Sequence, residues 1–145
     1  MLSKVSMLLL TTLLGNCAGQ KVIMMEGLKP GEIEGTWYAI QRTQPLYNDT
    51  AKCISATLNH KNGQVYEMVI GYRTFANEKL EKRLIVKDDS AHPAQFLFAD
   101  QGRPNTYAVL SRTPVIEPAD LDSAIRVMEK NEVRLPLLIV DQADC

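Results

Sequence analysis

The sequence predicts an all-β domain with a single helix near its C-terminal end. Short stretches in which apolar and polar residues alternate follow one another along the chain, and the clearest covers residues 53–59. Apolar residues recur at helical spacing in only one place, after Pro118. A period of two is typical of strands with one buried face, and a period of 3.6 is typical of a helix. We therefore expect β-hairpins that form an antiparallel barrel or sandwich, with the helix packed outside it.

The first nineteen residues have the layout of a secretory signal peptide. Lys4 supplies a positive charge, residues 5–14 form an apolar run, and small residues follow at 15–19. The run is shorter than the roughly 20 residues that a membrane-spanning helix needs. We expect removal of residues 1–19, which leaves one exported domain over residues 20–145. A bacterial lipoprotein signal ending at Cys17 is the alternative, although its preceding residue, Asn16, is not the usual small residue.

A loop and a strand are expected to follow the predicted leader. Residues 27–31 contain two glycines and a proline, which favour a loop. Residues 35–43 are rich in aromatic and β-branched residues and are expected to form a strand. The stretch 44–52 is expected to be an irregular exposed loop. It contains Asn48, the first residue of an Asn-Asp-Thr acceptor sequon, which should carry a glycan if a eukaryotic cell exports the protein.

The strongest local signal is a β-hairpin. In residues 53–59 apolar and polar side chains alternate, so one face of this strand should be buried. Asn62 and Gly63 come next, and an Asn-Gly pair readily takes the positive φ angles of a tight hairpin turn. Residues 64–72 should therefore return as the second strand.

Further strands and the helix complete the expected fold. Strand candidates lie at residues 83–87, 94–99 and 106–111. The helix, 118–131, begins with a proline, which suits the first helical position because its missing N–H would have no partner there. Its apolar stripe consists of Leu121, Ala124, Ile125 and Met128. A short apolar run, 137–140, precedes the terminal cysteine.

The composition argues against several classes of partner. The chain is 46% hydrophobic and 23% charged, with a formal net charge of -1. These values are typical of a globular domain and give no reason to expect nucleic acid or an anionic membrane as a partner. The histidines, His60 and His92, fall in expected turns. A metal site would need more ligands than these and two distant cysteines, so we expect no metal and no cofactor.

The cysteine count becomes informative once the leader is set aside. Cys53 and Cys145 remain, which is an even number in an oxidising compartment. We expect them to form one intramolecular disulfide that closes a loop of about 92 residues. Two free thiols are the alternative.

Three segments resemble the lipocalin family, and in particular its apolipoprotein D-like branch with its insect relatives. Residues 35–38, Gly-Thr-Trp-Tyr, are similar to the Gly-X-Trp-Tyr signature of the first lipocalin strand. Residues 110–114, Leu-Ser-Arg-Thr-Pro, are similar to a segment of the last barrel strand. The third feature is Cys-Ile-X-Ala at 53–56 together with Asp-Gln-Ala-Asp-Cys at 141–145. The resemblance covers residues 31–145 and implies an antiparallel up-and-down β-barrel with a C-terminal helix packed outside.

The resemblance also implies a role for two residues. In the family, the tryptophan of the first strand lies at the closed end of the barrel, and an arginine of the last strand lies across its ring. Carried over, this pair is Trp37 and Arg112, a structural floor with a cation–π contact worth about 0.5 to 2 kcal/mol.

One departure from the family concerns the number of strands. The additional hairpin that a lipocalin carries before its last strand is not found between Asp100 and Ser111. About two strands are therefore missing or shortened, and we expect the barrel to be incomplete. Open strand edges could pair with another chain, so both a monomer and a homodimer are expected forms.

The favoured function is a secreted carrier of a small hydrophobic ligand such as a lipid, fatty acid, sterol, retinoid or tetrapyrrole. Such a site needs an apolar interior with few polar groups. The same side chains could also fill a small barrel completely. The candidate ligand-binding residues are Ile54, Ala56, Leu58, Tyr66, Met68, Phe96, Phe98 and Tyr107.

Two other classes of function remain open. One is a secreted protein-interaction lipocalin with a vestigial pocket, which the missing strands favour. The other is a lipocalin-type enzyme, which would use Cys53 as a thiol; we favour it less because that cysteine is expected to be oxidised. A haem ligand could only be His60 or His92.

Overall fold

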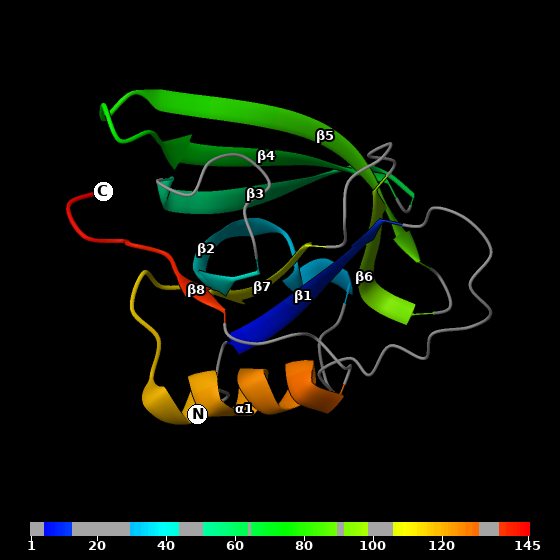
Figure 1. Ribbon diagram of the computed structural model, residues 1–145. Coiled ribbons are helices and arrows are strands. Elements are labelled where there is room, and N and C mark those ends of the chain that lie inside the picture. Colours follow the sequence, from blue (N-terminus) through cyan, green and yellow to red (C-terminus); the bar gives the residue numbers. More distant parts are fainter. Residues whose placement is uncertain are drawn as a thin grey trace.

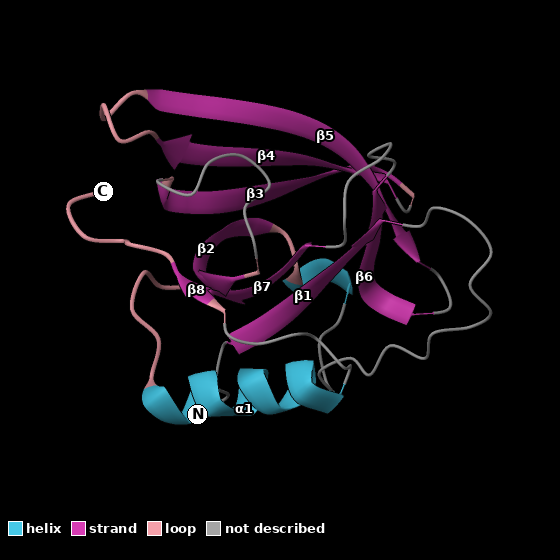
Figure 2. Cartoon of the chain, in the orientation of Figure 1, coloured by secondary structure: helices cyan, strands magenta, loops and turns pink. Residues whose placement is uncertain are grey.

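The computed structural model describes residues 5–12, 30–43, 51–63, 65–89, 92–98, 106–130 and 137–145 (Figure 1). Its elements are β1 (Val5–Thr12), a 3-10 turn (Pro30–Glu32), β2 (Gly35–Arg42), β3 (Lys52–Asn62), β4 (Val65–Arg73), β5 (Lys79–Asp89), β6 (His92–Phe98), β7 (Thr106–Ser111), α1 (Pro118–Lys130) and β8 (Leu138–Ile139). The helix lies outside the strands, next to β1 and β7 (Figure 2). The predicted fold class, antiparallel β-sheet with one late helix, is confirmed.

Five consecutive strands, β2 to β6, form an antiparallel meander. The predicted hairpin is its centre: β3 and β4 pair from Lys52 with Arg73 down to Asn62 with Val65. The turn between them contains Gly63 at a φ of 50°, the positive angle expected for this position. This hairpin prediction is confirmed.

The predicted positions of both histidines are wrong, because each lies in a strand and not in a turn. His60 was expected in a turn but lies within β3, because the strand continues to Asn62 and only Gly63 turns the chain. His92 was also expected in a turn and is instead the first residue of β6. The predicted strand 83–87 extends over Lys79–Asp89, since its mixed charges suit a strand with a wet face.

The strands of the meander do not close a barrel by themselves. β7 pairs with β2, and β2 pairs with β3, so the sheet curls round on that side. On the other side, no described residue of β6 pairs with β7, and β1 lies between them. β1 is antiparallel to β7 over Val5–Leu10 and parallel to β6 over Leu10–Thr12. The predicted incompleteness is therefore present: strands β2 to β7 leave one opening, at the place where a hairpin is missing.

The segment in that opening comes from the predicted signal peptide. Val5–Thr12 is most of its apolar run, and apolar residues of this kind suit a buried strand as well as a leader. The signal-peptide prediction concerns processing and stays a prediction. Among the described residues, no helix is long and apolar enough to cross a membrane.

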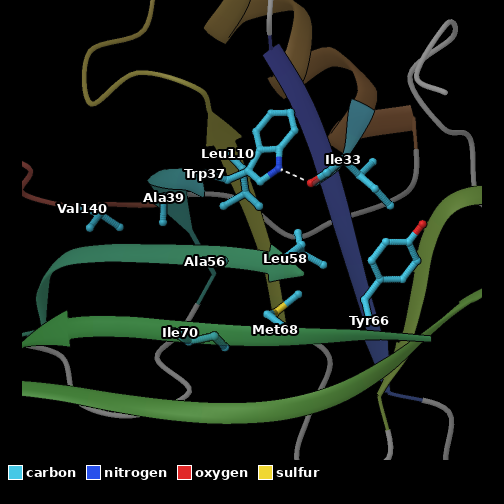
Figure 3. Packing of buried hydrophobic residues seen from close by; sticks show 10 residues of the cluster. All are labelled: Ile33, Trp37, Ala39, Ala56, Leu58, Tyr66, Met68, Ile70, Leu110 and Val140. Atoms are coloured by element: carbon cyan, nitrogen blue, oxygen red, sulfur yellow. Dashed lines mark hydrogen bonds between the residues drawn. The ribbon is translucent and has the colours of Figure 1, made fainter. Parts of the chain in front are cut away.

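Two clusters of buried side chains hold the structure together. The larger one lies on the inner face of the sheet and is shown in Figure 3; it consists of Ile33, Trp37, Ala39, Ala56, Leu58, Tyr66, Met68, Ile70, Leu110 and Val140. The smaller one joins β7 to the helix through Val109, Ala124 and Met128, which are fully buried. Leu110 and Val109 thus face opposite sides of the same strand, as strand alternation requires.

Candidate functional site

The inner face of β3 and β4 gathers most of the predicted ligand-binding residues whose side chains the structure describes. Leu58 pairs with Met68 and Ala56 pairs with Ile70, so these side chains are cross-strand neighbours on one face. Leu58 and Met68 are each only 1% exposed. Tyr66 is also buried in this cluster, and Figure 3 shows its ring beside Leu58 and Met68.

The other predicted ligand-binding residues divide into two groups. Ile54 is partly buried and packs against the inner cluster. Phe96, Phe98 and Tyr107 lie on β6 and β7, and their side chains lie outside the described residues. Contact with a ligand stays a prediction for every member of the set.

The imidazole ring of His60 contacts two neighbouring residues at the end of the β3–β4 hairpin. Its Nε2 lies 2.9 Å from the carbonyl oxygen of Gly63, and its ring lies 5.1 Å from the ring of Tyr66 at a tilted angle. No group of three or more histidine, cysteine or acidic side chains that could hold a metal occurs in the part of the chain that the structure describes. The expectation of no metal and no cofactor stays a prediction.

Trp37 and Arg112 are in contact at one end of the inner face. The guanidinium carbon of Arg112 lies 3.5 Å from the centroid of the Trp37 ring, so the predicted cation–π contact is present. The same guanidinium donates hydrogen bonds to the carbonyl oxygens of Thr36 at 3.1 Å, Glu34 at 2.7 Å and Glu32. Partial burial lowers the pKa of Arg112 from its ordinary value, but an arginine in a protein stays protonated. Arg112 thus fixes both the ring and the chain that leads into β2.

The backbone around Trp37 is shaped for this contact. The indole Nε1 of Trp37 donates a hydrogen bond to the carbonyl oxygen of Ile33 at 2.8 Å, drawn as a dashed line in Figure 3. Gly35 lies between them at a φ of 95°, where other residues are strained. A Cβ at Gly35 would lie 3.2 Å from Nη1 of Arg112, so a side chain would also crowd the guanidinium. The positive φ angle and the nearby guanidinium therefore both explain why the Gly-X-Trp-Tyr signature has glycine at this position.

Replacing Arg112 by alanine is expected to lower the free energy of unfolding by about 1 to 3 kcal/mol. The change removes the cation–π contact, the hydrogen bonds to three carbonyl groups and the packing of the side-chain stem. Urea unfolding monitored by Trp37 fluorescence measures the loss. Arg126→Ala, at an exposed position of α1, is the matched control and should change the unfolding free energy by less than about 0.5 kcal/mol. An unchanged midpoint together with a large loss of ligand affinity would place Arg112 in the pocket instead of the floor.

The predicted disulfide between Cys53 and Cys145 is confirmed, with a sequence separation of 92. Hydrogen bonds hold the C-terminal tail in the same place. The backbone N–H of Cys53 donates to the carbonyl oxygen of Asp141 at 2.8 Å. The Gln142 amide donates to the carbonyl oxygens of Ala39 at 2.8 Å and Ile54 at 2.9 Å, which joins the tail to β2 and β3. The sequence pattern did not predict this role of Gln142.

One buried charge was missed by the sequence interpretation. Arg42, the last residue of β2, is only 8% exposed. Strict alternation from Trp37 would place Gln41 on the inner face and Arg42 on the outer face. The pairing with β7 shifts between Ala39 and Gln41, and this irregularity reverses the alternation. A β-bulge has no signal in a single sequence, so the inward position of Arg42 was not foreseeable.

The glycosylation prediction and the alternative lipoprotein prediction lie outside the described residues. Asn48 belongs to the stretch between β2 and β3, and Cys17 belongs to the stretch after β1. Both stay predictions.

Comparison with known proteins identifies the fold. No protein-family model and no curated protein sequence matches the chain. Among solved structures, apocrustacyanin C2 is 9% identical over 77% of this chain and 78% of its own, with a TM-score of 0.60. Lobster apocrustacyanin A1 is 8% identical with the same coverages and a TM-score of 0.58. The siderocalin Ex-FABP is 12% identical over 78% of this chain and 97% of its own, with a TM-score of 0.58. Crustacyanins and siderocalins are lipocalins, so the chain has the lipocalin fold.

Proposed function

We propose that the protein is a secreted carrier that binds a small hydrophobic ligand on the inner face of its sheet. The observation that carries the proposal is the cluster of apolar side chains that β2, β3 and β4 contribute to the inner face of the sheet, next to the Trp37–Arg112 pair. Such a surface, with few polar groups, is what an apolar guest requires. The siderocalin Ex-FABP, which shares the fold, is described as functioning through dual ligand specificities.

Further parts of the proposal rest on the sequence. The chain would be a member of the apolipoprotein D-like branch, exported after removal of residues 1–19 and glycosylated at Asn48. The disulfide is compatible with an extracellular protein, because such bonds persist in oxidising compartments. The same bond argues against a thiol-dependent enzyme, since Cys53 is joined to Cys145 and is not a free nucleophile.

A protein-interaction role is the second candidate, and one observation favours it. The strands from β2 to β7 leave an opening between β6 and β7 that only β1 fills. If the leader is removed, two strand edges lose their partner and could pair with another chain.

The carrier proposal predicts saturable one-to-one binding of a fluorescent polyene fatty acid. Binding should quench the fluorescence of Trp37, the only tryptophan of the sequence. Ala56→Phe should weaken this binding at least tenfold, because the new ring projects from the inner face into the space a ligand would use. Thr57→Phe carries the same side chain one residue further along β3, on the opposite face, and should change the affinity less than twofold. Circular dichroism checks that both variants fold. Absence of binding by the unmodified protein would reject the carrier function, and equal binding by both variants would move the site away from this face.

A further inference from the structure

β2 and β3 pair over only the first half of β2, and the C-terminal tail continues the sheet beyond that point. The last β2–β3 pair is Tyr38 with Ser55. Further along, β2 pairs with β8 instead, and Gln41 lies opposite Ile139. Figure 1 shows the tail leaving β8 beside β2 and passing toward β3 and β4. The tail therefore lies in a gap where β2 and β3 separate.

One side-chain amide bridges this gap at the point where it begins. Nε2 of Gln142 lies 2.8 Å from the carbonyl oxygen of Ala39 and 2.9 Å from that of Ile54. These two residues would form the next rung of the β2–β3 ladder after Tyr38 and Ser55. Both carbonyls point to the same nitrogen, and two acceptors cannot hydrogen-bond to each other. The two N–H donors of Gln142 therefore close a rung that β2 and β3 cannot close by themselves.

The backbone of the tail joins the two strands as well. The N–H of Val140 donates to the carbonyl oxygen of Ile40 on β2 at 2.9 Å. The N–H of Cys53 on β3 donates to the carbonyl oxygen of Asp141 at 2.8 Å. The side chain of Val140 is only 5% exposed and belongs to the inner cluster, and Figure 3 shows it beside Ala39. The tail thus covers the inner face from the side, between the two strands.

The tail is fixed firmly at its ends and less firmly in its middle. At one end Leu137 packs against the cluster between β7 and α1, and at the other end Cys145 forms the disulfide. In between, Leu138 and Ile139 are exposed, and only Val140 is buried. A segment with few buried apolar contacts and a few backbone hydrogen bonds can detach locally while the rest of the domain stays folded.

We propose that residues 138–144 form a strap that closes a side opening to the inner face between β2 and β3, and that Gln142 holds the strap closed. Detachment of the strap breaks the four hydrogen bonds across the gap and takes Val140 out of the inner cluster. Gln142 is a positioning residue, because it acts on the two strands and not on a ligand. The detachment does not depend on the proposed carrier function, whereas the use of the opening as a ligand route rests on that function.

Amide hydrogen exchange of the full chain tests the detachment. The N–H groups of Val140 and Cys53 bond across the gap, whereas those of residues 56–58 belong to a part of β3 that is paired on both sides. The first set should exchange at least about tenfold faster, with little dependence on low concentrations of urea, because a local opening exposes little surface. Equal rates and equal urea dependence for both sets would overturn the proposal, since the strap would then open only when the whole domain unfolds.

Gln142→Met tests the role of the amide, because it keeps the length of the side chain and removes both donors. Exchange of the Val140 N–H should become about 10- to 100-fold faster, the factor expected for the loss of two neutral hydrogen bonds. Gln41→Met is the matched control: Gln41 is another half-buried glutamine, outside the bridge, and its replacement should change this exchange less than about twofold. Unchanged exchange in Gln142→Met would mean that Gln142 does not hold the strap.

The rates of ligand binding test the route. With a polyene fatty acid as the probe, Gln142→Met should raise the association and dissociation rates by a similar factor of at least about threefold and leave Kd within about twofold, because a gate changes passage in both directions and not the bound state. Unchanged rates together with faster exchange would overturn the side route. If the unmodified protein binds no fatty acid, the carrier function and the route are both wrong, while the exchange measurement still decides whether the strap detaches.

Discussion

Removing the Cys53–Cys145 disulfide is expected to lower the free energy of unfolding by about 4 to 5 kcal/mol. In the chain-entropy account, a cross-link that closes a loop of about 92 residues lowers the conformational entropy of the unfolded chain, and this raises the free energy of unfolding by that amount. Most domains are stable by only about 5 to 15 kcal/mol, so losing the bridge should remove roughly a quarter or more of the stability of a domain in this range.

The structure indicates that removing the disulfide lowers stability mainly by changing the unfolded state and not the folded one. The tail that carries Cys145 keeps other attachments, including the two hydrogen bonds of the Gln142 amide and one from Arg73 Nη2 to the Cys145 carbonyl oxygen at 3.1 Å. These contacts should hold the tail on β2, β3 and β4 after reduction. The folded structure should therefore change little, while the unfolded chain gains freedom.

The disulfide prediction is measured by urea unfolding of the full chain and of the Cys53→Ala/Cys145→Ala variant. Cys17→Ser is the matched control, because Cys17 lies outside the bridge, and it should leave the midpoint unchanged. Thiol labelling of the denatured, unreduced protein should leave Cys53 and Cys145 unmodified. Equal midpoints for the oxidised protein and the double variant would contradict the chain-entropy explanation.

The features predicted best are those that depend on neighbouring residues. The alternation in residues 53–59 predicted which side chains of β3 face the interior, and Ala56 and Leu58 are buried there. Asn62 and Gly63 predicted the turn because the φ angle that a hairpin needs is a local property. The helix start at Pro118 follows from the same kind of local rule.

Features that depend on pairing between distant residues were not predictable in the same way. The inward position of Arg42 follows from a bulge in the β2–β7 register, which is set by contacts between residues far apart in sequence. The hydrogen bonds of Gln142 join the tail to Ala39 and Ile54, which lie 103 and 88 positions away in the sequence. The Trp37–Arg112 contact was anticipated from a family resemblance and not from spacing, because these residues lie on different strands.

The place of β1 is the clearest case of two interpretations of one segment. An apolar run after a positive charge is typical of a leader, and the sequence contains nothing that indicates a strand partner for it. The opening between β6 and β7 supplies that partner, since β7 pairs with β1 from Val5 with Ser111 to Leu10 with Thr106. Both interpretations hold if the segment lies in the sheet before processing and leaves it afterwards.

The strand role of β1 predicts a register-specific cross-link in uncleaved protein produced without export. Leu8 lies opposite Ala108, and directly opposed residues on neighbouring antiparallel strands are close enough for a disulfide. In a Cys17→Ser background, Leu8→Cys/Ala108→Cys should oxidise to a cross-linked form. Leu9→Cys/Ala108→Cys is the matched control: it is shifted by one residue, projects to opposite faces, and should stay reduced. Equal cross-linking of both pairs would show that the segment is not fixed in this register.

Removal of residues 1–19 is then expected to convert a monomer into a dimer. β6 and β7 would each lose the strand beside them and expose a row of unpaired N–H and C=O groups, which another copy of the chain can satisfy by strand pairing. Size-exclusion chromatography with light scattering compares the uncleaved chain with the exported protein, and the intact mass of each identifies its N-terminus. The uncleaved chain should be monomeric and the processed chain dimeric.

A processed monomer at high concentration would mean that β6 and β7 close on each other, which would produce a smaller barrel with less room for a ligand. An exported protein that keeps residues 5–12 would instead show that the segment is a permanent strand of the fold and that the leader prediction is wrong.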